Sequence, residues 1–132
     1  MRISGLVGLL EVLMDLNKDY PKDIVEKAYE AIEVARNSGK IKKGVNEVTK
    51  IIERGQAKLV VIAKDVNPQE IIMHFPPLCE EKETLLVIVP SKKDLGAAAG
   101  LQVGTSAVAL VSEGNAQDII KDIAKKVSVK HG

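Results

Sequence analysis

The chain has 132 residues, of which 45% are hydrophobic and 28% charged, and this is the size and composition of one globular domain with one core. Its formal net charge of +1 gives no indication of nucleic-acid binding, and no apolar run is long enough to span a membrane. The single cysteine, Cys79, excludes an internal disulfide and suits a reducing, cytoplasmic compartment. Because acidic residues follow it, we expect a raised thiol pKa and an inert packing role.

Residues 1–20 are interpreted as a weakly ordered extension of a single domain that covers residues 21–129. Residues 1–13 are apolar, but they have only Arg2 as a charged start and no small-residue cleavage site, so a secretory signal is not expected. A native start at Met14 would omit this segment.

The hydrophobic periodicity and the capping residues predict the following elements in chain order. They are a helix at 21–37, a strand at 40–42, a helix at 44–54, a strand at 59–63, a helix at 68–74 with Asn67 as its cap, and a helical turn at 78–82. A strand at 85–89, a Ser91-capped helix ending near 99, a strand at 107–111 and a helix from 115 or 116 to 127 complete the chain.

Three of the predicted strands are apolar at every position, and they alternate with helices. A strand that is covered on both faces has this pattern. The sequence therefore predicts an α/β fold, a three-layer α/β/α sandwich with a small, mixed, four-stranded sheet.

The helix at 44–54 separates polar from apolar side chains. At about 100° per residue, an amide, a carboxylate and three cations share one face: Lys43, Asn46, Glu47, Lys50 and Arg54. The opposite face carries Val45, Val48, Ile51 and Ile52. Amide, carboxylate and ammonium groups together can donate to and accept from base edges while tolerating a phosphate nearby.

The charge of this region differs from that of the whole chain. Residues 40–58 hold two acids and six basic residues, the latter being Lys40, Lys42, Lys43, Lys50, Arg54 and Lys58. A local balance of +4 indicates an anionic partner bound at one place. Two alternatives stay open, namely a solvated helix face and an i,i+3 ion pair between Glu47 and Lys50 that contributes about 0.2–0.5 kcal/mol.

Four motifs occur in order along the chain. They are Lys43-Gly44-x-Asn46-Glu47-x-Thr49-Lys50, Leu59-Val60-Val61-Ile62-Ala63-x-Asp65, His74-x-Pro76-x-Leu78-Cys79 and Ser91-Lys92-x-x-Leu95-Gly96-x-Ala98-x-Gly100. With these motifs, residues 21–127 resemble the kink-turn RNA-binding family of ribosomal proteins, specifically its archaeal large-subunit members. The resemblance implies the same α/β/α sandwich.

The partner that the resemblance implies is the kink-turn, an internal loop in which tandem sheared G·A pairs flank a three-nucleotide bulge and the duplex bends sharply. A regular A-form major groove is too deep and narrow for side chains, whereas a kink opens it. The resemblance implies that Glu47 accepts from guanine and that Asn46 and Lys50 hydrogen-bond guanine edges. Lys43 and the Gly44 backbone would face a phosphate at the helix N-terminus, with Lys42 and Arg54 on the same basic surface.

A second contact region is implied for the bulged nucleotide. Lys92 would hold its phosphate or base, and the loop Leu101-Gln102-Val103-Gly104 would cover the flipped-out base with apolar side chains. Asn67 and Ile71 would complete the pocket. Some relatives carry arginine in place of Val103, and several carry a carboxylate in place of Asn67. The small residues from Gly96 to Gly100 also predict close helix packing.

The expected function is that of a non-enzymatic protein that stabilises kink-turns in ribosomal RNA, in box C/D and H/ACA guide RNAs and in RNase P RNA. A Nop5-type scaffold and fibrillarin would be partners in box C/D particles, and the free protein would be a monomer without a cofactor. An alternative is a protein-interaction module whose basic helix face binds an acidic protein. An enzyme is not expected, because the chain lacks a phosphate-binding loop and its two histidines, His74 and His131, have no convincing catalytic partner.

Overall fold

The computed structural model describes the backbone of residues 20–131 and the side chains of residues 20–126. The predicted extension at residues 1–20, apart from Tyr20, and the question of a start at Met14 lie outside the described residues.

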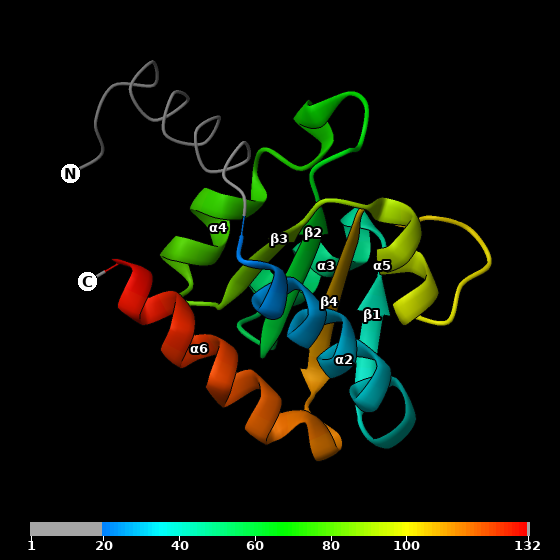
Figure 1. The fold of residues 1–132 in the computed structure, drawn as a ribbon. Helices are drawn as coiled ribbons and strands as arrows, with labels where there is room; N and C mark the ends of the chain where they lie inside the picture. Colours follow the sequence, from blue (N-terminus) through cyan, green and yellow to red (C-terminus); the bar gives the residue numbers. More distant parts are fainter. Residues whose placement is uncertain (1–19, 132) are drawn as a thin grey trace.

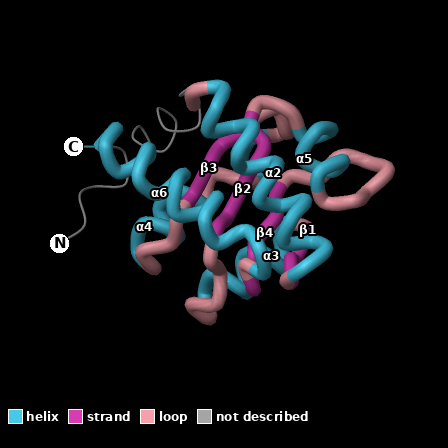
Figure 2. The backbone as a smooth tube through the Cα atoms, turned by 60° about the horizontal axis from the view of Figure 1, so that its bottom comes forward, coloured by secondary structure: helices cyan, strands magenta, loops and turns pink. Residues whose placement is uncertain are grey.

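Four strands form one mixed sheet in the order β1-β4-β2-β3 (Figures 1 and 2). They are β1 (Lys40–Lys43), β2 (Leu59–Ala63), β3 (Leu86–Val89) and β4 (Ala107–Ser112). β2 pairs in parallel with β3, and β4 lies antiparallel between β1 and β2. The predicted mixed sheet of four strands is therefore confirmed.

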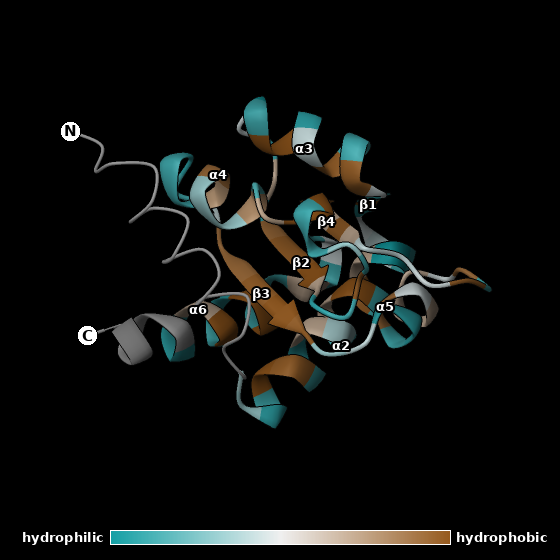
Figure 3. Cartoon of the chain, turned by 90° about the horizontal axis from the view of Figure 1, so that it is seen from above, coloured by the Kyte–Doolittle hydropathy of each residue, from teal (hydrophilic) through white to brown (hydrophobic). Residues whose placement is uncertain are grey.

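Helices cover both faces of this sheet. α2 (Lys22–Ser38) packs against α5 (Lys92–Ala98) and α6 (Gln117–His131), while α3 (Val45–Glu53) and α4 (Phe75–Glu81) lie on the other face (Figure 3). Every residue of β2 is buried, as expected for a strand between two helical layers. The predicted three-layer sandwich is confirmed. α3 and α4 form the outer layer on the face of the sheet opposite α2, α5 and α6.

The predicted helix at 68–74 is wrong. The chain forms a single 3-10 turn at Gln69–Ile71, and no side chain caps it, so the predicted Asn67 cap is also wrong. A new helix, α4, begins instead at Phe75, before the predicted turn at 78–82. Pro76 and Pro77 lack the N–H groups that would continue a preceding helix, but proline suits a first turn, where those donors have no helical acceptor.

Other local predictions agree with the structure. The hydroxyl of Ser91 accepts a hydrogen bond from the backbone N–H of Asp94 at 3.1 Å, which caps α5 as predicted. Cys79 is a buried, free thiol that packs in the core. Burial raises the pKa of Cys79 to about 12. The predicted inert role thus agrees with the structure, but burial is the cause rather than the neighbouring carboxylates.

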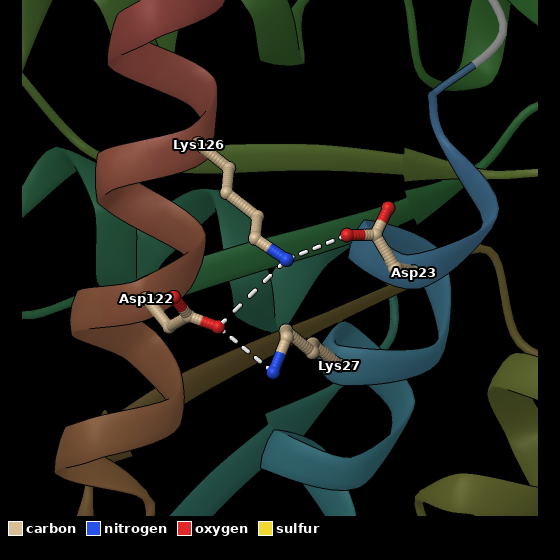
Figure 4. Close-up of polar contacts among 4 residues, drawn as sticks. All are labelled: Asp23, Lys27, Asp122 and Lys126. Carbon is tan, nitrogen blue, oxygen red and sulfur yellow. Dashed lines mark hydrogen bonds and ion pairs between the residues drawn. The ribbon is translucent and has the colours of Figure 1, made fainter.

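The surface between α2 and α6 carries an exposed network of ion pairs (Figure 4). Lys126 Nζ lies 2.6 Å from Asp23 Oδ2, and Lys27 Nζ lies 2.8 Å from Asp122 Oδ2. Hydrogen bonds from these lysines hold the pKa values of both aspartates below their ordinary value. The charges of Lys27 and Lys126 are therefore neutralised by protein carboxylates.

Candidate nucleic-acid interface

The sheet topology gathers the predicted contact segments at one edge. β1 and β2 are both antiparallel to β4, and β3 is parallel to β2, so the carboxyl ends of β1, β2 and β3 share an edge with the amino end of β4. Residues 44, 64–71 and 90–92 follow β1, β2 and β3, and residues 101–106 precede β4. We call this the carboxyl edge; it lies at the top of the sheet in Figure 1.

Gly44 opens α3 at this edge. Its φ angle of 97° lies in the left-handed region, which favours glycine, and its N–H donates to the Ala107 carbonyl oxygen at 2.9 Å. This hydrogen bond fastens the start of α3 to β4. No atom lies within 4 Å of where a Cβ would stand, so the helix N-terminus is open to an approaching anion.

The two faces of α3 follow the predicted division. Val48, Ile51 and Ile52 are buried and Val45 is half-buried, whereas the side chains of the polar face are exposed: Lys43, Asn46, Glu47, Lys50 and Arg54. Figure 3 shows this division as hydrophilic colour along the outer side of α3. Lys42, in β1, is half-buried.

The ion pair between Glu47 and Lys50 that the spacing allowed is not formed. No salt bridge joins these two residues in the described part of the chain, and neither side chain has a hydrogen-bond partner there. The carboxylate, the amide of Asn46 and the ammonium group therefore face outward with their polar atoms available to a ligand.

A partly buried hydrogen bond joins α3 to the N-terminus of α4. The Thr49 hydroxyl donates its hydrogen to the Val45 carbonyl oxygen at 2.7 Å, so it accepts from His74 Nε2–H, which lies 2.8 Å away. The His74 ring also contacts the Phe75 ring, with centroids 4.2 Å apart. His74 lies at the N-terminus of α4, and its hydrogen-bond partner is a hydroxyl from α3.

We expect Thr49→Val to destabilise the protein by about 1–3 kcal/mol, because it leaves the half-buried His74 N–H without an acceptor. Thr49→Ser keeps the hydroxyl and should retain most of the stability. Urea unfolding at pH 8 measures both variants. Equal losses in the two variants would mean that the methyl group of Thr49, and not the hydrogen bond, is responsible.

Burial lowers the pKa of His74 below its ordinary value of 6.5, with Glu53 acting weakly in the opposite sense. The folded state therefore binds a proton less readily than the unfolded chain. The free energy of unfolding therefore does not depend on the protonation of His74 well above pH 6.5. It decreases as the pH falls below 6.5 towards the lowered pKa, because the unfolded chain then binds the proton more readily. Urea unfolding between pH 8 and pH 5 should show this decline in the wild type and a smaller one in His74→Gln.

The second predicted contact region rests on a link that the sequence reasoning missed. The carboxylate of Asp65, just after β2, accepts the backbone N–H of Lys92 at 2.9 Å. The backbone N–H of Thr105 donates to the Lys92 carbonyl oxygen at 3.1 Å. Lys92 is thus held between the β2 loop and the loop before β4. The signal for Asp65 was its place directly after one buried strand, because parallel strands bring such positions together.

Two apolar side chains stand out on this edge. Val103 is 70% exposed and Ile71 is 39% exposed, and they are the exposed large hydrophobic residues of the described chain. Leu101, expected to act with Val103, is half-buried and packs against the core, so of these two apolar side chains only Val103 is exposed. Gln102, Asn67 and the Lys92 side chain are exposed. Among the described residues, no hydrogen bond or ion pair joins this group to the polar face of α3.

Neither a metal site nor a membrane span is present among the described residues. No three histidine, cysteine, aspartate or glutamate side chains there come together closely enough to hold a metal ion. No helix of that part combines the length and the apolarity needed to cross a bilayer.

Comparison with known proteins agrees with this geometry. Among solved structures, the chain is similar to a Giardia lamblia 15.5kD RNA binding protein, with a TM-score of 0.80 and 29% sequence identity over 86% of this chain and 95% of that one. Residues 26–120, well over half of the chain, match a protein family that includes ribosomal proteins. The family predicted from the four motifs is thereby confirmed: the chain belongs to the Ribosomal protein L7Ae/L30e/S12e/Gadd45 family.

Proposed function

We propose that this protein binds RNA by recognising the kink-turn and holding it in its bent form. Its family and its RNA-binding structural neighbour support RNA as the partner. The observation that carries the finer proposal is the outward face of α3, where Asn46, Glu47 and Lys50 are exposed and have no partner in the described chain.

The chemistry of this face suits the guanines of tandem sheared G·A pairs. Such a pair leaves the guanine Watson–Crick edge unpaired, with an N1–H donor and an O6 acceptor. The Glu47 carboxylate can accept from the donor, and the Asn46 amide and the Lys50 ammonium can donate to acceptors. A phosphate would lie at the open N-terminus beside Gly44, near the cation of Lys43.

The residues of the second predicted contact region would hold the bulged nucleotide. An unstacked base exposes an apolar face, and the exposed side chains of Val103 and Ile71 offer apolar contact on the same edge of the sheet. Lys92, Gln102 and Asn67 supply polar groups around them. Because free RNA exchanges between open and kinked forms, a protein that contacts only the kinked form increases its population.

Such a protein prepares RNA for assembly and performs no reaction itself. We propose ribosomal RNA, box C/D and H/ACA guide RNAs and RNase P RNA as its settings. In box C/D particles the bent RNA and the protein would together receive a Nop5-type scaffold and the fibrillarin methyltransferase. An acidic protein that binds the basic face of α3 is the competing proposal, favoured by the same local charge of +4.

Filter binding separates the two proposals. We expect a kink-turn RNA to bind at least about 100-fold more tightly than the same RNA with its tandem G·A pairs replaced by Watson–Crick pairs, because two guanine edges are lost. Equal binding of both RNAs would contradict kink-turn recognition and favour the acidic protein partner.

A further inference from the structure

We propose that the interface continues beyond the kink, and that Lys40 and Lys58 bind the phosphates of a duplex stem flanking it. This inference rests on the proposed function. Neither lysine is among the residues that the family motifs imply for RNA contact. Together we call them the far-edge lysines.

The far-edge lysines lie at the sheet edge opposite the carboxyl edge. Lys40 opens β1, and Lys58 directly precedes β2. β4 lies between these two strands, with Ser112 opposite Lys40 and with the Leu110 carbonyl oxygen accepting the backbone N–H of Lys58 at 2.7 Å. Since neighbouring strands are about 4.8 Å apart, the two lysine backbones are separated by about 10 Å.

α3 connects the two edges. It begins after β1 at the carboxyl edge and must end near the start of β2 at the opposite edge, and its nine residues span about 13 Å. Lys50 and Arg54 are four residues apart and share the exposed face of the helix. Arg54, at the C-terminal end, is therefore closer to the far edge than Lys50 is. Positive residues are therefore present at the proposed guanine contacts, at the end of α3, and at the far edge towards which α3 runs, where Lys40 and Lys58 lie.

The far-edge lysines are not neutralised by the protein. Both are exposed, and neither has an ion-pair partner among the described residues. The acidic residues nearest in the sequence are Glu33 and Glu47 for Lys40 and Glu53 for Lys58, and none of them forms a salt bridge with these lysines in the same part of the chain. On the α2–α6 surface, by contrast, Lys27 and Lys126 are paired with aspartates (Figure 4). The far-edge lysines thus differ from Lys27 and Lys126 in that no protein carboxylate is paired with them among the described residues.

A nucleic-acid backbone fits these positive residues better than an acidic protein does. They begin at the proposed kink-turn contacts, and a stem that leaves the kink carries one phosphate at every nucleotide. Binding of lysine to phosphates releases counterions, so contacts of this type are independent of sequence and strongly dependent on salt. The stem contact would therefore add affinity without adding base specificity.

The test compares three RNAs that contain the same kink-turn. In the first, both stems are just long enough to pair; in each of the other two, a different stem is extended by a full helical turn. The variant is Lys40→Gln/Lys58→Gln. Its matched control is Lys121→Gln/Lys125→Gln, which removes two charges from exposed lysines of α6. Affinities are measured by filter binding over a series of salt concentrations.

We expect the far-edge variant to lose about tenfold in affinity for one of the extended RNAs and to bind the short RNA within a factor of about two of wild type. Its slope of log affinity against log salt on that extended RNA should be less steep by about 2. Losses that are equal for short and extended RNAs, equal in the α6 control, or absent would overturn the stem contact. Failure of the proposed function would appear differently, as wild-type protein that does not distinguish the short kink-turn from its Watson–Crick-paired counterpart.

Discussion

Glu47→Ala is expected to weaken binding to a kink-turn by about 10- to 100-fold while slightly strengthening binding to plain duplex RNA. The first effect follows from loss of a charged acceptor for guanine, since hydrogen bonds to charged groups contribute about 1.5–3 kcal/mol. The second follows because the exposed Glu47 carboxylate, which has no partner in the described chain, repels phosphates. The two changes have opposite signs, and filter binding to both RNAs measures them.

Glu53→Ala is the matched control. Glu53 is an exposed carboxylate at the end of the same helix, so its removal changes the protein charge by the same amount. We expect slightly tighter binding to both RNAs, because only repulsion is lost. If Glu47→Ala behaves in the same way as Glu53→Ala, then Glu47 does not read a base.

Gly96→Ala should destabilise the protein by about 1–3 kcal/mol, although alanine is normally the better residue in a helix by about 0.5–1 kcal/mol. The reason is steric. A Cβ at this buried position of α5 would overlap the backbone carbonyl oxygen of Val103 and stand 3.0 Å from the Gly104 Cα, and neither is a flexible side chain. Urea unfolding gives the sign and size of the change.

The same substitution should also affect RNA. Moving the backbone at Val103 displaces the exposed side chain that we propose to cover the bulged base, so the variant should no longer distinguish a kink-turn with that base from one with an abasic bulge. Ala97→Ser is the control, because it also adds one heavy atom but at an exposed neighbouring position, and we expect a change within about 0.5 kcal/mol. A Gly96→Ala protein as stable as wild type would show that the loop accommodates the methyl group.

Most of the fold could be predicted because burial leaves a clear pattern in the sequence. The strand at Leu59–Ala63 has the predicted bounds, since five apolar residues flanked by polar ones have few other interpretations. The position of β4 between β1 and β2 could not be predicted. Apolar runs indicate that a strand is covered on both faces, but they do not identify the strands beside it. The helix predicted from Pro68 to His74 is wrong because the short apolar stretch in this segment fits a helix and a 3-10 turn equally well.

The candidate site divides in the same way. The outward face of α3 follows from 3.6-residue periodicity, so the exposure of Asn46, Glu47 and Lys50 was predictable. The link from Thr49 to His74 and the link from Asp65 to Lys92 join residues 25 and 27 positions apart, and both depend on how the elements meet in space. The different exposure of Leu101 and Val103 was likewise not predictable, because a loop has no periodicity that separates inside from outside.

The position of β1 at the margin of the sheet has a consequence for the protein on its own. In the described chain, β1 pairs only with β4, which leaves its other side with backbone groups that could pair with a second molecule. Three of its four residues are lysines, and two such strands brought together would repel each other. The charges that would attract a polyanion therefore also protect the protein from edge-to-edge aggregation, and a chain that lost them would be expected to precipitate before it could be assayed at high concentration.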